Sequence, residues 1–71
     1  MMVKDANNNE LKDGDTVKLI KDLKLKGTST TLKRGTTVKN IRLTDNENEI
    51  DCRVNKMSIV LKTEFVKNNT N

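Results

Sequence analysis

The sequence is poor in the side chains that most catalytic and metal sites use. It has no histidine, so it lacks the commonest metal ligand and the usual general base near neutral pH. Its one cysteine, Cys52, cannot form an intramolecular disulfide, which excludes a disulfide-stapled scaffold. A zinc site would rest on that cysteine and carboxylates, a set that zinc rarely accepts. We therefore expect no metal, no cofactor and no enzymatic activity.

Long apolar runs are missing as well. No segment approaches the roughly 20 apolar residues of a membrane-spanning helix. The first residues, Met1 to Asp5, contain no apolar core of the kind found in signal peptides. A free cysteine without an export signal favours a reducing compartment. The sequence thus predicts a cytoplasmic protein with no membrane partner.

The apolar residues that are present recur in short alternating runs. Although 34% of the residues are charged, this alternation favours a folded β domain over disorder. No window sustains the apolar spacing of a helix. One domain is expected over residues 1–71, with frayed ends at 1–2 and 68–71. The pattern predicts strands within residues 16–22, 36–43, 50–54, 57–61 and 65–66.

Two details of these strands can be predicted. Residues 55 and 56 fit the two-residue turn of a hairpin between the strands 50–54 and 57–61. Within 36–43, Val38 is out of phase with Ile41 and Leu43, so a β-bulge or a strong bend is expected there. Phe65 is expected in the core. Five short strands predict an all-β fold, a small five-stranded SH3-like barrel, with residues 23–34 as its longest connection.

Several segments carry a family likeness, in order and almost without gaps. They run from Val3-Lys4-Asp5-Ala6-Asn7 and Asp13-Gly14-Asp15 through Ile20-Lys21-Asp22-Leu23-Lys24, Lys33-Arg34-Gly35-Thr36 and Val38-Lys39-Asn40-Ile41-Arg42-Leu43 to Ile50-Asp51-Cys52 and Leu61-Lys62-Thr63-Glu64-Phe65-Val66-Lys67. Together they resemble the C-terminal domain of the PhnA family, the alkylphosphonate-operon proteins. The resemblance implies an SH3-like barrel of unassigned biochemical role, with a nominal link to alkylphosphonate uptake and utilization.

The sequence departs from the family pattern in three places. Many members resemble two-part proteins with a cysteine-rich zinc ribbon ahead of this domain, and functions of that ribbon are not expected here. The loop Asp45–Glu49 lacks a histidine seen in some relatives. The Asn55-Lys56 turn lacks the glycine often found there, so a type I′ turn would place Lys56 at positive φ, and another turn type stays open. A metal-dependent phosphonate hydrolase is excluded, because its metal centre needs several histidines together with carboxylates and the sequence has no histidine.

Positive charge is concentrated in the middle of the chain. Between Thr16 and Thr44, eight cations stand against Asp22 alone, a net charge of +7. One interpretation is a basic face that binds nucleic acid or another polyanion. The other is a solvated surface that keeps a small domain soluble. The single aromatic residue offers no stacking platform for bases, which favours the second. The cations are Lys18, Lys21, Lys24, Lys26, Lys33, Arg34, Lys39 and Arg42.

A smaller anion site is possible within the same region. The run Lys26-Gly27-Thr28-Ser29-Thr30-Thr31, with Lys33-Arg34-Gly35, offers amides, hydroxyls and cations to a phosphate or phosphonate. The spacing is not that of a P-loop. An ordinary polar loop between strands is the alternative.

The remaining chemistry-bearing residues have structural interpretations. Cys52 alternates with Ile50 and Val54, which predicts a buried, unreactive thiol. Asp13 and Asp15 flank a glycine and are expected to form a turn rather than a cation site. Open edge strands could pair with a protein partner or form a weak homodimer. The sequence therefore favours a non-enzymatic binding or adaptor module, with nucleic-acid binding as the alternative.

Overall fold

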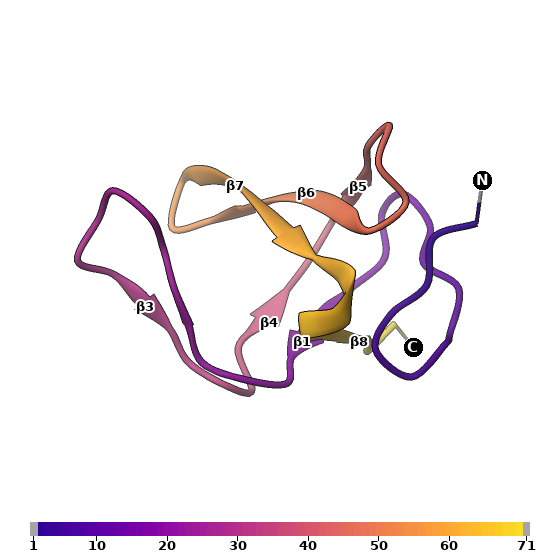
Figure 1. Ribbon diagram of the computed structural model, residues 1–71, viewed down its shortest axis with the longest axis horizontal. Helices are drawn as coiled ribbons and strands as arrows, with labels where there is room; N and C mark the ends of the chain where they lie inside the picture. Colours follow the sequence, from indigo (N-terminus) through magenta and orange to yellow (C-terminus); the bar gives the residue numbers. More distant parts are fainter. Residues whose placement is uncertain (1, 71) are drawn as a thin grey trace.

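The computed structural model describes residues 2–70, which form an all-β fold with no α-helix (Figure 1). A single 3-10 turn, η1, spans Thr63–Phe65. Most strands have only two or three residues, and β6 and β7 are the long ones, with six each. In chain order the strands are β1 Val17–Leu19, β2 Leu23–Lys24, β3 Thr31–Leu32, β4 Thr37–Val38, β5 Arg42–Leu43, β6 Glu49–Val54, β7 Met57–Lys62 and β8 Val66–Asn68.

The strands form three small antiparallel sheets, with the orders β4-β1-β8, β2-β3 and β5-β6-β7. Figure 1 shows β5, β6 and β7 lying across from β4, β1 and β8, with the β2–β3 hairpin reaching to one side. The all-β class is confirmed. No sheet within residues 2–70 closes into the expected five-stranded barrel, because outside β6 and β7 the strands have only two or three residues and the ladders between the three sheets do not join.

One apolar core joins the three sheets. Along β1 and β6 the buried side chains alternate with outward ones, as the period of a strand requires. The N-terminal segment, which shows little pattern in the sequence, contributes two fully buried residues. The core consists of Val3, Leu11, Val17, Leu19, Leu32, Val38, Ile41, Ile50, Cys52, Leu61 and Val66.

The bend expected within residues 36–43 is confirmed. Asn40 has φ +60° and separates β4 from β5. Because the backbone turns there, Val38 and Ile41 are both fully buried and Leu43 packs against the same core. A straight strand would have placed Val38 on the opposite face from Ile41.

Three other elements differ from the prediction. The first strand is shorter than residues 16–22, and residues 23–34 are no bare connection but the β2–β3 hairpin, with Leu32 buried. Phe65 lies in η1 and is only half-buried, outside the core cluster. Its ring lies beneath Lys21, whose Nζ is 4.7 Å from the ring centroid. The cation therefore covers a face that the core does not.

The β6–β7 hairpin has the predicted two-residue turn. Val54 pairs with Met57, and the turn residues Asn55 and Lys56 have φ +52° and +67°. Two positive φ values define a type I′ turn, whose twist matches that of the flanking strands. The alternative turn type is not adopted. Lys56 therefore takes a left-handed conformation that its Cβ disfavours.

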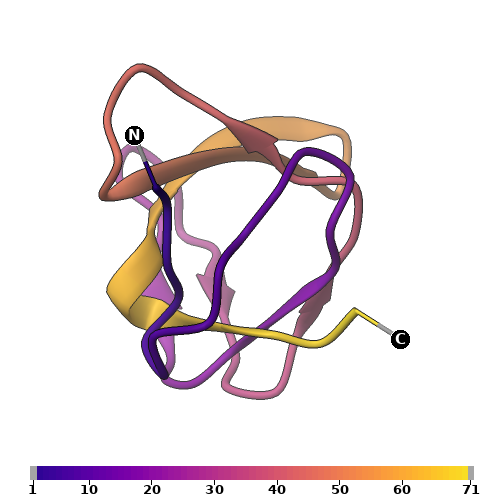
Figure 2. The ribbon, with the colours of Figure 1, turned by 90° about the vertical axis from the view of Figure 1, so that its right-hand side faces the viewer.

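The buried carboxylate of Asp5 joins the N-terminal segment to the last strand. Its Oδ1 accepts the backbone N–H groups of Asn7 and Asn9 at 2.9 and 2.8 Å, and its Oδ2 accepts that of Asn68 in β8. Figure 2 shows the N-terminal segment passing beside β8. Burial raises the pKa of Asp5, but these hydrogen bonds and one from the Asn9 amide lower it by more, so the pKa lies below its ordinary value.

The C-terminal tail is bonded to β1 as far as it is described. Asn68 belongs to β8, and Asn69 donates its N–H to the carbonyl of Thr16 at 2.7 Å. The N–H of Thr16 donates to Thr70 Oγ1 at 2.8 Å. Of the expected frayed ends, residues 68–70 are thus held by hydrogen bonds, and residues 1 and 71 lie outside the described part.

We expect Lys56→Gly to stabilise the domain by about 1 kcal/mol, because glycine removes the cost of a left-handed residue in the type I′ turn. Urea unfolding followed by circular dichroism measures this gain. Asn55→Gly is the matched control and should gain less, since asparagine tolerates positive φ. Equal or opposite effects of the two substitutions would contradict the turn geometry.

We expect Asp5→Asn to destabilise the domain by about 2 kcal/mol, because an amide cannot accept all the N–H groups that the carboxylate satisfies. A midpoint about 10 °C lower in thermal unfolding is the corresponding shift for a chain of this size. Asp45→Asn, which removes an exposed carboxylate with no hydrogen bond to it, should leave stability almost unchanged.

The same carboxylate should make the domain sensitive to acid. Since the folded pKa is lowered, its stabilisation is complete above the ordinary aspartate pKa and is lost as the pH falls through the folded value, below about pH 4. The free energy of unfolding should therefore fall less steeply with acid in Asp5→Asn than in the parent chain. Parallel slopes in both proteins would contradict this role.

Candidate anion-binding groove

The eight cations of residues 16–44 do not share one face. Lys18 points outward from β1, opposite Thr37 of β4 and Lys67 of β8. Lys21 lies over Phe65. The remaining six cations fall into three groups. They are Lys33 and Arg34 at the β3–β4 turn, Lys24 and Lys26 in and just after β2, and Lys39 and Arg42 at the start of β5. The concentration of positive charge in the sequence is thus divided among separate places in the structure.

The structure does not bring together the two halves of the predicted anion loop. Gly27 and Thr28 form the tip of the β2–β3 hairpin, whereas Arg34 and Gly35 lie in the β3–β4 turn at its other end. At the tip, the N–H and the hydroxyl of Thr28 both donate to the carbonyl of Leu25, at 3.4 and 3.3 Å. Donors that an anion would need are therefore satisfied locally.

The β3–β4 turn already holds an anion of its own, the carboxylate of Asp22. The N–H of Arg34 donates to Asp22 Oδ1 at 2.7 Å, and Lys33 Nζ lies 3.9 Å from Oδ2. The N–H of Gly35 donates to the carbonyl of Leu19 at 2.9 Å. An external phosphate would have to displace these partners.

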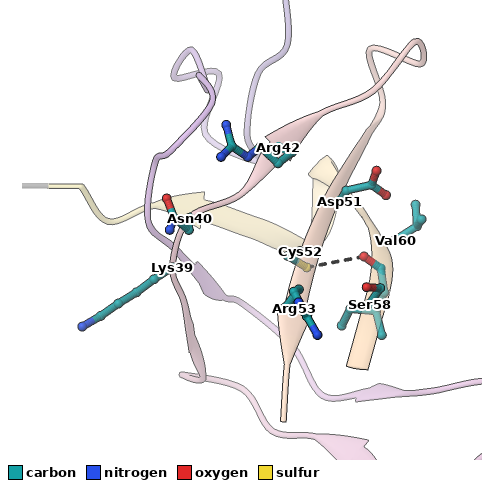
Figure 3. A pocket seen from close by; sticks show the side chains of 9 residues that line it. Lys39, Asn40, Arg42, Asp51, Cys52, Arg53, Ser58 and Val60 are labelled. Atoms are coloured by element: carbon teal, nitrogen blue, oxygen red, sulfur yellow. Dashed lines mark hydrogen bonds between the residues drawn. The ribbon is translucent and has the colours of Figure 1, made fainter. Parts of the chain in front are cut away.

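Lys39 and Arg42 line a groove with a volume of about 540 Å³ (Figure 3). A third cation, Arg53 of β6, lines the same groove. Figure 3 shows Arg42 on β5, Arg53 on β6 and the side chain of Lys39 pointing away from β6. We call this the arginine groove. Its lining residues are Lys39, Asn40, Arg42, Asp51, Cys52, Arg53, Ser58, Ile59 and Val60.

The register of the sheet positions the two arginines. Arg42 pairs directly with Asp51, and Arg53 is two residues further along β6, on the same face. Such diagonal neighbours are roughly 7–8 Å apart, within reach of long side chains. Within residues 2–70 the one ion pair joins Lys33 and Asp22, so neither arginine has a carboxylate within 4.0 Å. Arg53 donates one N–H to the carbonyl of Lys56 at 3.5 Å and keeps its other donors, so both guanidinium groups can still donate to a ligand.

Cys52 lies beneath this groove and is buried. Its Sγ donates to the carbonyl of Ile59 at 3.7 Å, the contact drawn in Figure 3. Burial, with a smaller contribution from the charge of Asp51, raises the pKa of the thiol to about 11. The predicted burial of Cys52 is confirmed, and the thiol carries almost no thiolate at neutral pH.

The sequence does not single out Arg53, because it lies outside the basic stretch 16–44. The alternation of residues 50–54 does predict that Asp51 and Arg53 point outward together. The alternation cannot predict which side chain of another strand lies next to Arg53. Only the β5–β6 register, with Arg42 opposite Asp51, brings the second arginine to the same place.

Lys24 and Lys26 line a different groove, between β2 and β7, together with Lys62.

Within the described chain, no three histidine, cysteine, aspartate or glutamate side chains gather as metal ligands would. Asp13 and Asp15 form the predicted turn: Asp13 Oδ1 accepts the N–H of Leu43 at 2.7 Å and Asp15 Oδ2 that of Lys12 at 2.9 Å. No helix over residues 2–70 is long and apolar enough to cross a bilayer.

Comparison with known proteins places the chain in a family. Residues 3–69 match the model of the PhnA domain. Protein YjdM of Escherichia coli (strain K12) is 56% identical over 70 residues, which cover 97% of this chain and 63% of that protein. Protein YjdM of Streptococcus mutans is 54% identical over 68 residues, covering 94% of this chain and 62% of the relative.

A YjdM homolog of Haemophilus influenzae is 54% identical over 67 residues, 94% of this chain and 52% of that protein. The chain thus spans between half and two thirds of the length of these relatives. The match to the family model covers almost all of the chain, from the buried Val3 to Asn69 in the C-terminal tail. The chain therefore belongs to the PhnA-domain family.

Proposed function

We propose that this domain is a non-enzymatic binding module, and that its arginine groove takes a tetrahedral phosphorus oxyanion carried by the ligand. The observation that carries the proposal is the pair Arg42 and Arg53, held on one face by strand register and free of any carboxylate within 4.0 Å in the described part of the chain. Guanidinium groups suit such oxyanions because they donate two parallel hydrogen bonds.

The surroundings of the two arginines support the same ligand chemistry. Asn40 and Ser58 line the groove and add neutral hydrogen-bond donors. Lys39 lies at the rim and adds charge without a fixed geometry. Asp51 lies opposite Arg42 and two residues before Arg53 on β6, and its negative charge reduces the attraction of the groove for an anion, which keeps the expected affinity low.

The absence of catalysis is part of the proposal. Cys52 is the one thiol of the groove, and its raised pKa and the hydrogen bond to Ile59 leave it inert. The nominal link of the family to alkylphosphonates fits an oxyanion ligand of this kind and stays a proposal here. We also keep an open SH3-like barrel as the proposed fold type, supported by three small antiparallel sheets around one core.

Nucleic-acid binding is the second candidate, because phosphodiesters present the same oxygens. The arginine groove favours a single phosphate group, since the other cations of residues 16–44 lie at other places. The two candidates differ in salt dependence. A polyanion that contacts several cations should lose affinity steeply with added salt, whereas one phosphate at two arginines should lose little.

We expect methylphosphonate and inorganic phosphate to shift the backbone amide signals of Asn40, Arg42 and Arg53 in a titration of the isotope-labelled domain. Two exposed charge-assisted contacts supply only a few kcal/mol, so the expected Kd is on the order of 1 mM. Either Arg42→Gln or Arg53→Gln should weaken binding roughly three- to fivefold. Arg34→Gln is the matched control, since that side chain lies at the β3–β4 turn, and should leave affinity unchanged.

Unmoved signals at about 20 mM of either anion, against sodium chloride of equal ionic strength, would contradict the proposal. Short duplex DNA and RNA form the second arm. Tight binding of either, abolished by added salt and weakened equally by Arg34→Gln and Arg42→Gln, would favour the nucleic-acid alternative.

We expect Cys52 to react slowly with iodoacetamide in the folded chain. With a pKa of about 11 against an ordinary 9.0, the thiolate fraction near pH 8 is roughly a hundredfold smaller than in the unfolded chain. Mass spectrometry of the alkylated fraction, in buffer and in denaturing urea, measures the ratio of the two rates. Comparable rates would mean that the thiol is accessible and ionised, which would reopen an enzymatic function.

A further inference from the structure

The second groove, between β2 and β7, has an apolar floor and a basic rim. We call it the β2–β7 groove. Its volume is about 460 Å³, and Leu25, Ile59 and Phe65 contribute half-buried apolar side chains to it. The exposed Lys24, Lys26 and Lys62 also line it. An apolar floor bordered by cations selects a ligand with both apolar and acidic groups.

The outer edge of β7 runs along this groove and is unpaired. In the order β5-β6-β7, all six residues of β7 pair with β6 on one side. On the other side no strand of the described chain pairs with it, and β2 belongs to a separate sheet. The backbone N–H and C=O groups along that edge are therefore open to a partner strand.

This edge also lacks the usual protection against pairing. It contains no proline, and Lys62 at its end is the one charged residue of Met57–Lys62. Val60, 57% exposed, is one of two large apolar side chains that are exposed in residues 2–70. A six-residue edge with an exposed valine is the kind of strand that other chains extend.

We propose that the β7 edge takes an extended segment of a partner protein in which apolar and acidic residues alternate, and that this segment pairs with β7 as an added strand. Its apolar side chains would face inward, beside Leu25 and Ile59. Its carboxylates would lie near Lys24 and Lys62. Alternation is required because successive side chains of a strand point to opposite faces.

Charge decides between this occupant and a second copy of the chain. The chain carries a net charge of +4, and within this groove Glu49 alone opposes the three lysines. Self-pairing through β7 would bring two such basic rims together, whereas an acidic segment neutralises one. Nucleic acid fits less well, since the floor offers apolar groups and one aromatic ring already covered by Lys21. The proposal does not depend on the arginine groove, which has its own cations.

The test uses fluorescence anisotropy with a labelled, capped peptide of alternating valine and glutamate, about eight residues long. It should bind the full chain at low salt and shift the amide signals of Met57–Lys62. Lys24→Glu and Lys62→Glu should each weaken binding about tenfold. Lys67→Glu, with the same charge change on β8, is the matched control and should have little effect.

Two further peptides test strand pairing itself. In a strand, the N–H groups of alternate residues point to the same edge, so methylating the nitrogens of all valines or of all glutamates blocks one edge only. One methylated peptide should lose binding and the other should keep it. The double variant Lys24→Glu with Lys62→Glu should instead bind a valine–lysine peptide. That gain of binding requires a folded domain, so a variant that fails to bind because it is misfolded cannot be mistaken for support.

Four results would overturn the proposal. They are no binding at low salt, equal binding of the two methylated peptides, equal weakening by Lys67→Glu and Lys62→Glu, and displacement of the peptide by duplex DNA of matched charge. Sedimentation that shows a dimer disrupted by Val60→Lys would assign the edge to a second copy instead. Failure of phosphate binding at Arg42 and Arg53 would leave this proposal intact.

Discussion

The carboxylate of Asp5 is the interaction on which the arrangement of this small domain depends. It is buried, and it is satisfied by N–H groups from two ends of the chain, in the turn at Asn7–Asn9 and in β8. A chain of this length buries only about 60% of its unfolded surface, so each core residue counts. By fixing the N-terminal segment against β8, Asp5 keeps Val3 and Leu11 in the core and closes it.

Both candidate sites arise because the sheets are incomplete. The chain turns at Asn40, so β5 begins only at Arg42, while β6 continues to Val54, and Arg53 has no direct partner on β5. That difference in length leaves the arginine groove. On the other side of the hairpin, β7 is as long as β6 and has no further strand beside it. The two grooves meet at Ile59 and Val60, so one hairpin supplies a wall to each.

Much of the fold could be predicted where apolar residues alternate without interruption. The β6–β7 hairpin, the bend near Asn40 and the burial of Cys52 all follow from such runs. The β2–β3 hairpin could not, because each of its strands has two residues and only Leu32 is buried. The core residues of the N-terminal segment are held by a hydrogen-bonded carboxylate rather than by a periodic pattern. Phe65 lies outside the core, contrary to the prediction, because it belongs to η1, which turns the chain before β8 begins.

Composition and alternation were enough to exclude histidine chemistry and a disulfide scaffold and to indicate an all-β domain, and the ordered segments from Val3 to Lys67 carried the family resemblance. They could not indicate which charges act together. In the sequence, Arg42 belongs with the cations of residues 16–44, and Lys62 stands apart from them. In the folded chain, strand register places Arg42 and Arg53 on one face, and Lys24 and Lys26 line the same groove as Lys62. Such neighbours are set by non-local pairing, which no local pattern records.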